Sequence, residues 1–258
     1  LLVWLDRNGT IKEQIALPKP LAWHAEHVGE NLLLDLDHEI YIFEPKDAKF
    51  REILAEQNIK KGSEIASFIC ASNDAAVFGM FGQIFAFYEG KISKLGEYKC
   101  STKSHVPILC AALSVDASML ALCTKENELQ ILNAKNSEIL SELRAEFGVL
   151  DKICFLDDET LLVRQYLENK LLSLDIKSAK VTKQPWIKDE YLRVSEFCVD
   201  TGKLVVIDQS RGYAIDLKSG EMRAEFRLDH VVKNCEAKFI DGKLAVRTDY
   251  GCFSLYQI

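Results

Sequence analysis

The sequence is poor in the residues that separate domains and in the long apolar runs that cross membranes. Only 5 of its 258 residues are proline, and no tract rich in proline, glycine or serine interrupts it. No apolar run approaches the roughly 18 residues that a transmembrane helix needs. We therefore expect a single domain over residues 1–258, a monomer as a fold unit, with no insertion into a membrane.

Motifs of the common enzyme and metal-site families are also missing. The chain has no Cys-x-x-Cys, Gly-x-Gly-x-x-Gly, Gly-Lys-Ser/Thr, Gly-x-Ser-x-Gly or His-Glu-x-x-His. We therefore expect no catalytic residues, no cofactor and no metal. Acidic residues outnumber basic ones by 39 to 32, for a net charge of −7. This balance argues against a nucleic-acid partner, which would need clustered Lys and Arg.

What the sequence does contain is a repeated pattern of short strands. Residues 203–226 hold three short apolar or amphipathic runs separated by polar turns, a pattern typical of an antiparallel meander. The corresponding strand recurs every 38 to 45 residues. It begins at Leu2, Ile40, Ile84, Leu129, Leu171, Tyr213 and Cys252.

A period near 42 residues with four short strands is typical of a β-propeller blade. The seven recurrences predict an all-β propeller of seven four-stranded blades, with the first and last incomplete. We expect about 25–35 further residues before Leu1 to supply the missing N-terminal strands, an estimate that rests on the blade period. A ring of six blades is the alternative.

Residues 104–133 resemble a degenerate WD repeat. Ser104 and His105 stand where that family has Gly-His, the turn 114–117 where it has Ser-Pro-Asp-Gly, and Leu132 and Asn133 where it has Trp-Asp. Asn127 falls where the family usually has Asp. The segments 4–6 and 215–217 are partial echoes. The resemblance implies membership in the wider propeller group, which includes quinoprotein-like propellers.

Eight cysteines are present, and five of them fall in the first, innermost strand of different predicted blades. These are Cys70, Cys110, Cys154, Cys198 and Cys235. We expect buried free thiols, because unpaired cysteine behaves as a small hydrophobe. Free thiols favour a reducing compartment, which predicts a cytoplasmic location. The periplasm is the alternative, if a signal peptide precedes Leu1.

A group of histidines and carboxylates in the second predicted blade could in principle hold a metal. The group consists of His24, His27, Asp37, His38 and Glu39. His24 and His27 are three positions apart on a predicted strand, so they point to opposite faces. We therefore interpret these residues as structural or solvated.

Aromatic and arginine side chains are expected on one face of the propeller, where the second-to-third-strand turns and the crossings between blades meet. The candidate partner-binding residues are Phe81, Arg164, Tyr166, Trp186, Tyr191, Arg211, Arg247 and Tyr250. This composition is typical of interface hot spots. For Trp186, the alternative is a plug that fills the gap between two blades, and Phe81 could instead fold back on its blade.

We predict a non-catalytic scaffold that binds protein partners through this face. One alternative is an accessory or assembly factor for a bacterial multi-subunit respiratory enzyme, such as periplasmic nitrate reductase, beside which small propellers are known. Another is a propeller enzyme, either a hydrolase or quinoprotein-like, because a fold alone does not determine function.

Overall fold

The computed structural model describes most of the chain. The described residues are 1–6, 10–56, 66–80, 82–98, 108–124, 128–144, 148–178, 180–182, 184, 186–187, 194–200, 202–229, 235–240, 242–248 and 252–258. They belong to two compact units, unit 1 (Leu1–Ala145) and unit 2 (Glu146–Ile258).

Unit 1 contains one hairpin and three four-stranded antiparallel sheets. The hairpin consists of β1 (Leu2–Leu5) and β2 (Ile11–Ile15). The first sheet contains β3 (Ala22–Val28), β4 (Asn31–Leu36), β5 (Glu39–Glu44) and β6 (Lys49–Glu52). The second contains β7 (Phe68–Ser72), β8 (Ala75–Met80), β9 (Gln83–Tyr88) and β10 (Lys91–Glu97). The third contains β11 (Ile108–Leu113), β12 (Met119–Thr124), β13 (Glu128–Asn133) and β14 (Ile139–Arg144).

Helix is scarce in the described residues, as the predicted all-β class requires. The 3₁₀ turn η1 (Pro45–Asp47) connects β5 to β6, and α1 (Ile53–Glu56) is a helix of only 4 residues. No helix in the described part of the chain is long and apolar enough to span a membrane.

Unit 2 contains two four-stranded sheets and one three-stranded sheet, all antiparallel. The first contains β15 (Leu150–Phe155), β16 (Thr160–Gln165), β17 (Lys170–Asp175) and β18 (Val181–Thr182). The second contains β19 (Glu196–Asp200), β20 (Lys203–Asp208), β21 (Arg211–Asp216) and β22 (Met222–Arg227). The third contains β23 (Cys235–Ile240), β24 (Lys243–Thr248) and β25 (Phe253–Gln257).

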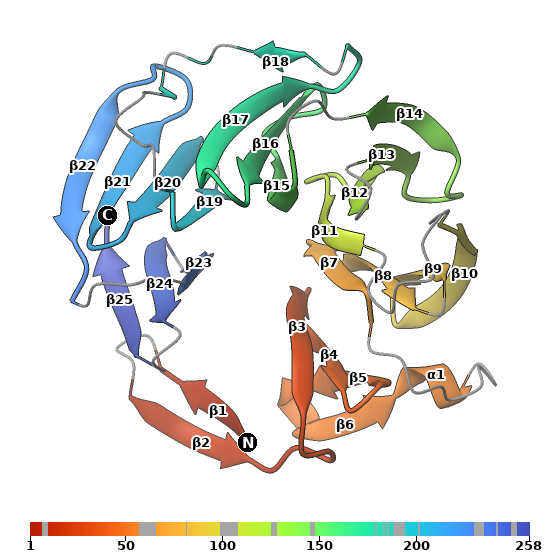
Figure 1. Ribbon diagram of the computed structural model, residues 1–258. Coiled ribbons are helices and arrows are strands. Elements are labelled where there is room, and N and C mark those ends of the chain that lie inside the picture. The colour runs from red at the N-terminus through yellow and green to blue at the C-terminus, as the bar shows by residue number, and fades with distance from the viewer. Residues whose placement is uncertain are drawn as a thin grey trace. The chain divides into compact units, whose positions relative to one another are not determined.

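The strands follow one another in chain order within every sheet, as Figure 1 shows for each unit. This is the meander predicted for propeller blades. Six sheets carry it with at least three strands, which agrees with the six-blade alternative. The remaining sheet, β1–β2, is a hairpin alone, so the described residues do not form a seventh blade.

The middle strands of each blade form its core because their apolar runs are buried on both faces. In β20, the run 204–207 is completely buried, and in β4 the run 32–36 is buried. The outer strand β22 instead alternates between exposed and half-buried residues. This decrease in burial from the middle strands to the outer strand is expected when neighbouring sheets pack face to face and only the outermost strand is exposed to solvent.

The turns between the third and fourth strands of three blades share one hydrogen-bonding pattern. Strand β13 ends at Asn133, β17 at Asp175 and β21 at Asp216. The side-chain Oδ1 of each of these residues accepts a hydrogen bond from the backbone N–H of a residue two or three positions later. In β21 the turn continues to Gly220, whose N–H donates to Asp216 O over 2.8 Å. Gly220 has a φ of +73°, a left-handed conformation that glycine adopts at no steric cost.

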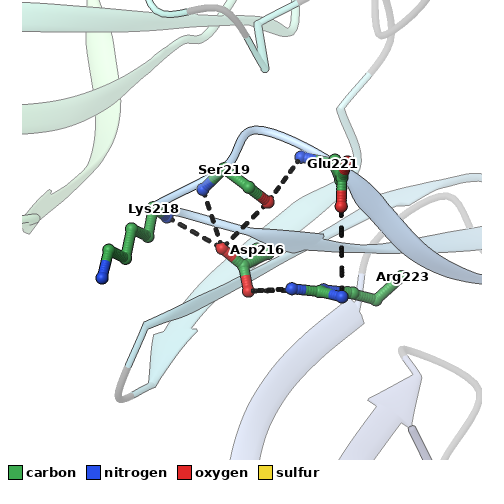
Figure 2. A network of polar contacts seen from close by, with 5 residues as sticks. All are labelled: Asp216, Lys218, Ser219, Glu221 and Arg223. Carbon is green, nitrogen blue, oxygen red and sulfur yellow. Dashed lines mark hydrogen bonds and ion pairs between the residues drawn. The ribbon is translucent and has the colours of Figure 1, made fainter.

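Asp216 accepts hydrogen bonds from Lys218, Ser219 and Arg223 around its turn (Figure 2). Its carboxylate accepts hydrogen bonds from the backbone N–H groups of Lys218 (3.0 Å) and Ser219 (2.8 Å) and from the Ser219 hydroxyl (3.2 Å). The Arg223 guanidinium donates to the other carboxylate oxygen over 2.8 Å. The Ser219 N–H and Arg223 therefore lower the pKa of Asp216 to about 2.

We expect a carbon-detected NMR titration to show Asp216 ionising near pH 2 in the native protein. A lowered folded-state pKa means that its stabilising effect is present above the ordinary value of 3.8 and is lost as the pH falls through about 2. Replacing Arg223 with Gln should raise the pKa of Asp216. The matched control is Arg211→Gln, which removes an exposed arginine that pairs with Glu225. An Asp216 pKa at its ordinary value in the unaltered protein would contradict this interpretation.

Candidate partner-binding surface

Three strand ends of unit 2 form the surface predicted to bind a partner. The turns 165–169 and 209–210 connect the second and third strands of two blades, and Arg247 lies near the end of β24, the second strand of the next blade. We call these residues, together with Arg211 at the start of β21, the unit 2 rim. The antiparallel order of the three sheets is identical, so these ends correspond to one another.

The turn 165–169 presents two apolar side chains to solvent. Tyr166 is 59% exposed and Leu167 is 83% exposed. The backbone beneath them is held on both sides, because the Tyr166 N–H donates to Val149 O over 2.9 Å and the Val194 N–H donates to Asn169 O over 2.8 Å. The rim therefore presents an apolar pair on a backbone that is anchored to both its own blade and the next.

Arg164 lies in β16, directly before this turn, and its side chain makes hydrogen bonds that hold the surrounding backbone in place. Its Nε and one terminal nitrogen donate to the two carboxylate oxygens of Asp151 over 2.9 and 3.0 Å, and the other terminal nitrogen donates to Ser195 O. Asp151 sits at a bulge between Leu150 and Lys152, and bulges commonly redirect a side chain. Burial opposes the charge on Arg164, but the Asp151 hydrogen bonds and nearby carboxylates raise its pKa overall.

The prediction that Arg164 binds a partner is therefore corrected. Only 14% of its side chain is exposed, and its donors are used within unit 2. Arg164 links the β15–β18 blade to the residue that precedes β19. This is a structural role, since a bidentate carboxylate pair combined with a backbone acceptor fixes the guanidinium in one geometry.

A second ion pair crosses between the same two blades. Lys152 of β15 pairs with the buried Glu196 of β19, and its ammonium lies 5.1 Å from the centre of the Phe197 ring. Glu196 Oε1 also accepts the Phe197 N–H over 2.6 Å. Together with Arg164, this pair joins the two blades on the side of the rim, which makes the rim a preorganised surface.

Arg211 and Arg247 remain on the surface, as the sequence predicted. Arg211 pairs with Glu225 over 3.3 Å and Arg247 with Glu236 over 3.1 Å, and all four side chains are largely exposed. Exposed pairs of this kind contribute little stability. Either arginine could therefore exchange its neighbour for a carboxylate of a partner at small cost.

Trp186 is not available to a partner, and the expectation that it anchors one is corrected. It is 2% exposed and belongs to a cluster contributed by both four-stranded blades of unit 2. The other buried members are Leu162, Leu171, Val194, Phe197, Leu204, Val206 and Ile215. The alternative interpretation, a plug between blades, describes its position.

Three of the predicted binding residues, Phe81, Tyr191 and Tyr250, lie outside the described residues. Leu167 was not predicted, although it directly follows Tyr166, which was. The signal that could have found it is an apolar Tyr-Leu pair inside a stretch that should be polar. Contact residues are often found in such turns, because loops on a rigid scaffold carry function.

Comparisons with known proteins address the fold. No protein-family model and no curated protein matches the sequence. Among solved structures, the computationally designed Ika8 protein is similar with a TM-score of 0.64 at 10% identity, over 97% of this chain and 75% of that one. BamB from Moraxella catarrhalis is similar with a TM-score of 0.55 at 12% identity, over 90% of this chain and 68% of that one.

This chain has a β-propeller fold. The predicted all-β class is thus confirmed, with the six blades of the alternative rather than the seven of the main prediction. At this level of sequence identity, the similarity to these two structures is evidence for the fold alone.

Two members of the predicted histidine and carboxylate group, His24 and Glu39, make contacts within unit 1. Asp35 is completely buried and accepts the Ala66 N–H over 2.8 Å, and His24 Nδ1 lies 3.5 Å from the same carboxylate oxygen. Glu39 accepts a hydrogen bond from the Tyr41 hydroxyl over 2.7 Å. Within the described residues, no three His, Cys, Asp or Glu side chains are grouped to hold a metal.

None of the five predicted inner-strand cysteines is in a disulfide, as expected. Cys70 and Cys235 are buried, whereas Cys110, Cys154 and Cys198 are half-buried. Burial raises the pKa of Cys198 to about 12 and also raises the pKa of Cys70 and Cys154. These three thiols therefore carry little thiolate, the reactive form, at neutral pH.

Proposed function

We propose that this propeller is a non-catalytic scaffold that binds a protein partner through the unit 2 rim. The observation that carries the proposal is the pair Tyr166 and Leu167, which project into solvent from a turn whose backbone is anchored at both ends. A fixed apolar pair costs less ordering entropy on binding than a mobile one. Aromatic side chains in such positions are typical hot spots.

The arginines of the rim favour a partner that carries carboxylates beside its apolar contact. Arg211 and Arg247 lie at corresponding ends of the following two blades and keep exposed guanidinium groups. The chain as a whole is acidic, with a net charge of −7. Exposed arginines on an acidic protein give the rim a distinct local potential, which helps to orient a partner.

We also place the blade β11–β14 with the WD-repeat-like propellers. In its turn 114–117, the Ser114 hydroxyl donates to Asp116 Oδ1 over 2.7 Å and accepts the Met119 N–H over 2.9 Å. This hydrogen bonding supports the interpretation of the segment as the family's polar turn. Ser104, His105 and Asn127, which also belong to the resemblance, lie outside the described residues, and Leu132 and Asn133 end β13. The cytoplasmic location and monomeric state expected from the sequence belong to the same proposal.

Replacing both Tyr166 and Leu167 with alanine should weaken binding of the partner by about 30-fold or more, the effect of losing about 2 kcal/mol at a hot spot. The immobilised protein would be incubated with an extract of its source cells, and retained proteins quantified by mass spectrometry. Both side chains are exposed, so the unfolding midpoint should change little.

The matched control is Tyr88→Ala, which removes an exposed tyrosine (57%) of β9 in unit 1. A partner of the rim is lost with the Tyr166 and Leu167 double variant and retained with Tyr88→Ala. The proposal fails if every protein retained by the unaltered chain is retained equally by the double variant. A direct titration of the identified partner then gives the change in Kd.

A further inference from the structure

Two cysteines lie directly opposite one another in the third sheet of unit 1. Cys110 of β11 and Cys123 of β12 are partners in the antiparallel register. Directly opposite residues project from the same face of a sheet, with their Cβ atoms about 4.5–5.5 Å apart. Neither cysteine is in a disulfide, and the two thiols belong to neighbouring strands and point to the same side.

The hydrogen-bond pattern of this ladder gives the spacing of the pair. The Ser114 N–H donates to Met119 O over 2.9 Å, and hydrogen-bonded positions alternate along an antiparallel ladder. The register from Leu113 back to Cys110 is regular, which makes Cys110 and Cys123 a hydrogen-bonded pair. The Cα atoms of such a pair are about 5.5 Å apart, close to the commonest separation in disulfides, about 5.5–6 Å. Their Cβ atoms, about 5.5 Å apart, must approach by about 1 Å to reach the roughly 3.5–4.5 Å of a disulfide, so closure requires a small local shift of β11 toward β12.

No other described cysteine of an inner strand has this arrangement. Each of the four others lies opposite a residue without a thiol. Cys70 lies opposite Val77, Cys154 opposite Leu162, Cys198 opposite Val205 and Cys235 opposite Thr248. The eight cysteines of the chain thus include one described cross-strand pair.

We propose that Cys110 and Cys123 are a redox modification site, which closes to a cross-strand disulfide on reaction with a small-molecule disulfide such as oxidised glutathione. The Cys110 thiolate attacks one sulfur of the glutathione disulfide and releases one glutathione thiolate. The Cys123 thiolate then attacks the Cys110 sulfur of the mixed disulfide and releases the second. Two protein thiols lose two protons and two electrons, and one glutathione disulfide becomes two glutathione thiols.

The different burial of the two thiols sets this order. Cys110 is half-buried, so a small oxidant can reach it, whereas Cys123 is completely buried. Cys123 is positioned to resolve the mixed disulfide from the adjacent strand. Its thiol donates a weak hydrogen bond to Thr124 O over 3.7 Å, which the reaction gives up in exchange for the covalent bond.

The test incubates the folded protein with oxidised glutathione, blocks the remaining thiols after unfolding, and maps the peptides without reduction. The count of free thiols should fall by two. Trypsin leaves both cysteines in one peptide, because no Lys or Arg lies between them, but cleavage before Asp116 separates them. The expected product is a disulfide that joins these two fragments.

Cys110→Ser should abolish the linked product and leave Cys123 free, while Cys154→Ser, which removes an inner-strand thiol opposite Leu162, should leave it unchanged. Circular dichroism checks that each variant folds, and Cys110→Ala replaces Cys110→Ser if it does not. Three results overturn the proposal: no link in the unaltered protein, a link from Cys110 to another cysteine, or a stable glutathione adduct on Cys110 with Cys123 still free.

Discussion

Replacing Trp186 with alanine is expected to lower the free energy of unfolding by about 3–5 kcal/mol, the range for truncating a large aromatic side chain in a core. Trp186 is buried between the two four-stranded blades of unit 2, against Leu162 of β16 and Phe197 of β19. Alanine would leave a cavity that these strands cannot readily fill, because β16 is paired on both sides and β19 is held by its pairing with β20. Urea unfolding followed by circular dichroism measures the loss.

The matched control for Trp186 is Trp23→Ala in β3, where the tryptophan is 50% exposed. Its truncation should cost less than about 1 kcal/mol, since surface substitutions away from special features have small effects. Trp186→Phe should retain part of the stability, because it removes less volume. If Trp186→Ala kept its stability but lost a partner, the tryptophan would be a contact residue and its buried position would be incorrect.

The β-strand architecture was predictable because its signal is local. The run 204–207 is apolar, is followed by a polar turn and a second run, and the structure places these residues in β20 and β21 as a paired ladder. Alternation of short runs with turns is sufficient to predict a meander. The repeat spacing predicted the same unit along the rest of the chain.

The number of blades was less predictable, because a recurring hairpin does not specify how many strands join it. The residues near Leu2 fit the repeat as well as those near Ile40. In the structure, however, β1 pairs with β2 alone, whereas β5 is paired on both sides by β4 and β6. Strand partners are tertiary contacts, which the spacing of one strand type does not contain.

The candidate site shows where sequence composition is insufficient. Trp186 and Arg164 have the residue types of a hot spot, but both side chains turn inward. Arg164 depends on a bulge at Asp151 and on a carbonyl 31 residues away, at Ser195. Neither feature is visible in the sequence. By contrast, Arg211 and Arg247 lie on the surface as predicted, and their ion-pair partners Glu225 and Glu236 are exposed as well.

Replacing Arg164 with methionine is expected to lower the free energy of unfolding by about 2–3 kcal/mol. The substitution keeps an unbranched side chain and removes the guanidinium, which leaves the Asp151 carboxylate and the Ser195 carbonyl without their donor. Loss of one member of a fully buried pair costs about 3–5 kcal/mol. The smaller figure applies here because 26% of the Asp151 side chain is exposed and water can partly replace the arginine.

Arg247→Met provides the matched control, because Arg247 occupies the corresponding position of β24 but its ion pair with Glu236 is exposed. Its replacement should change stability by less than about 0.5 kcal/mol. Adding Asp151→Asn to Arg164→Met should cost less than the sum of the single changes, since no unpaired carboxylate remains, and the two sites should couple by about 1–2 kcal/mol. Additive effects, or equal losses from Arg164→Met and Arg247→Met, would show that Arg164 does not join the two blades. The anchored backbone on which the proposed contact of Tyr166 and Leu167 depends would then have lost one of its supports.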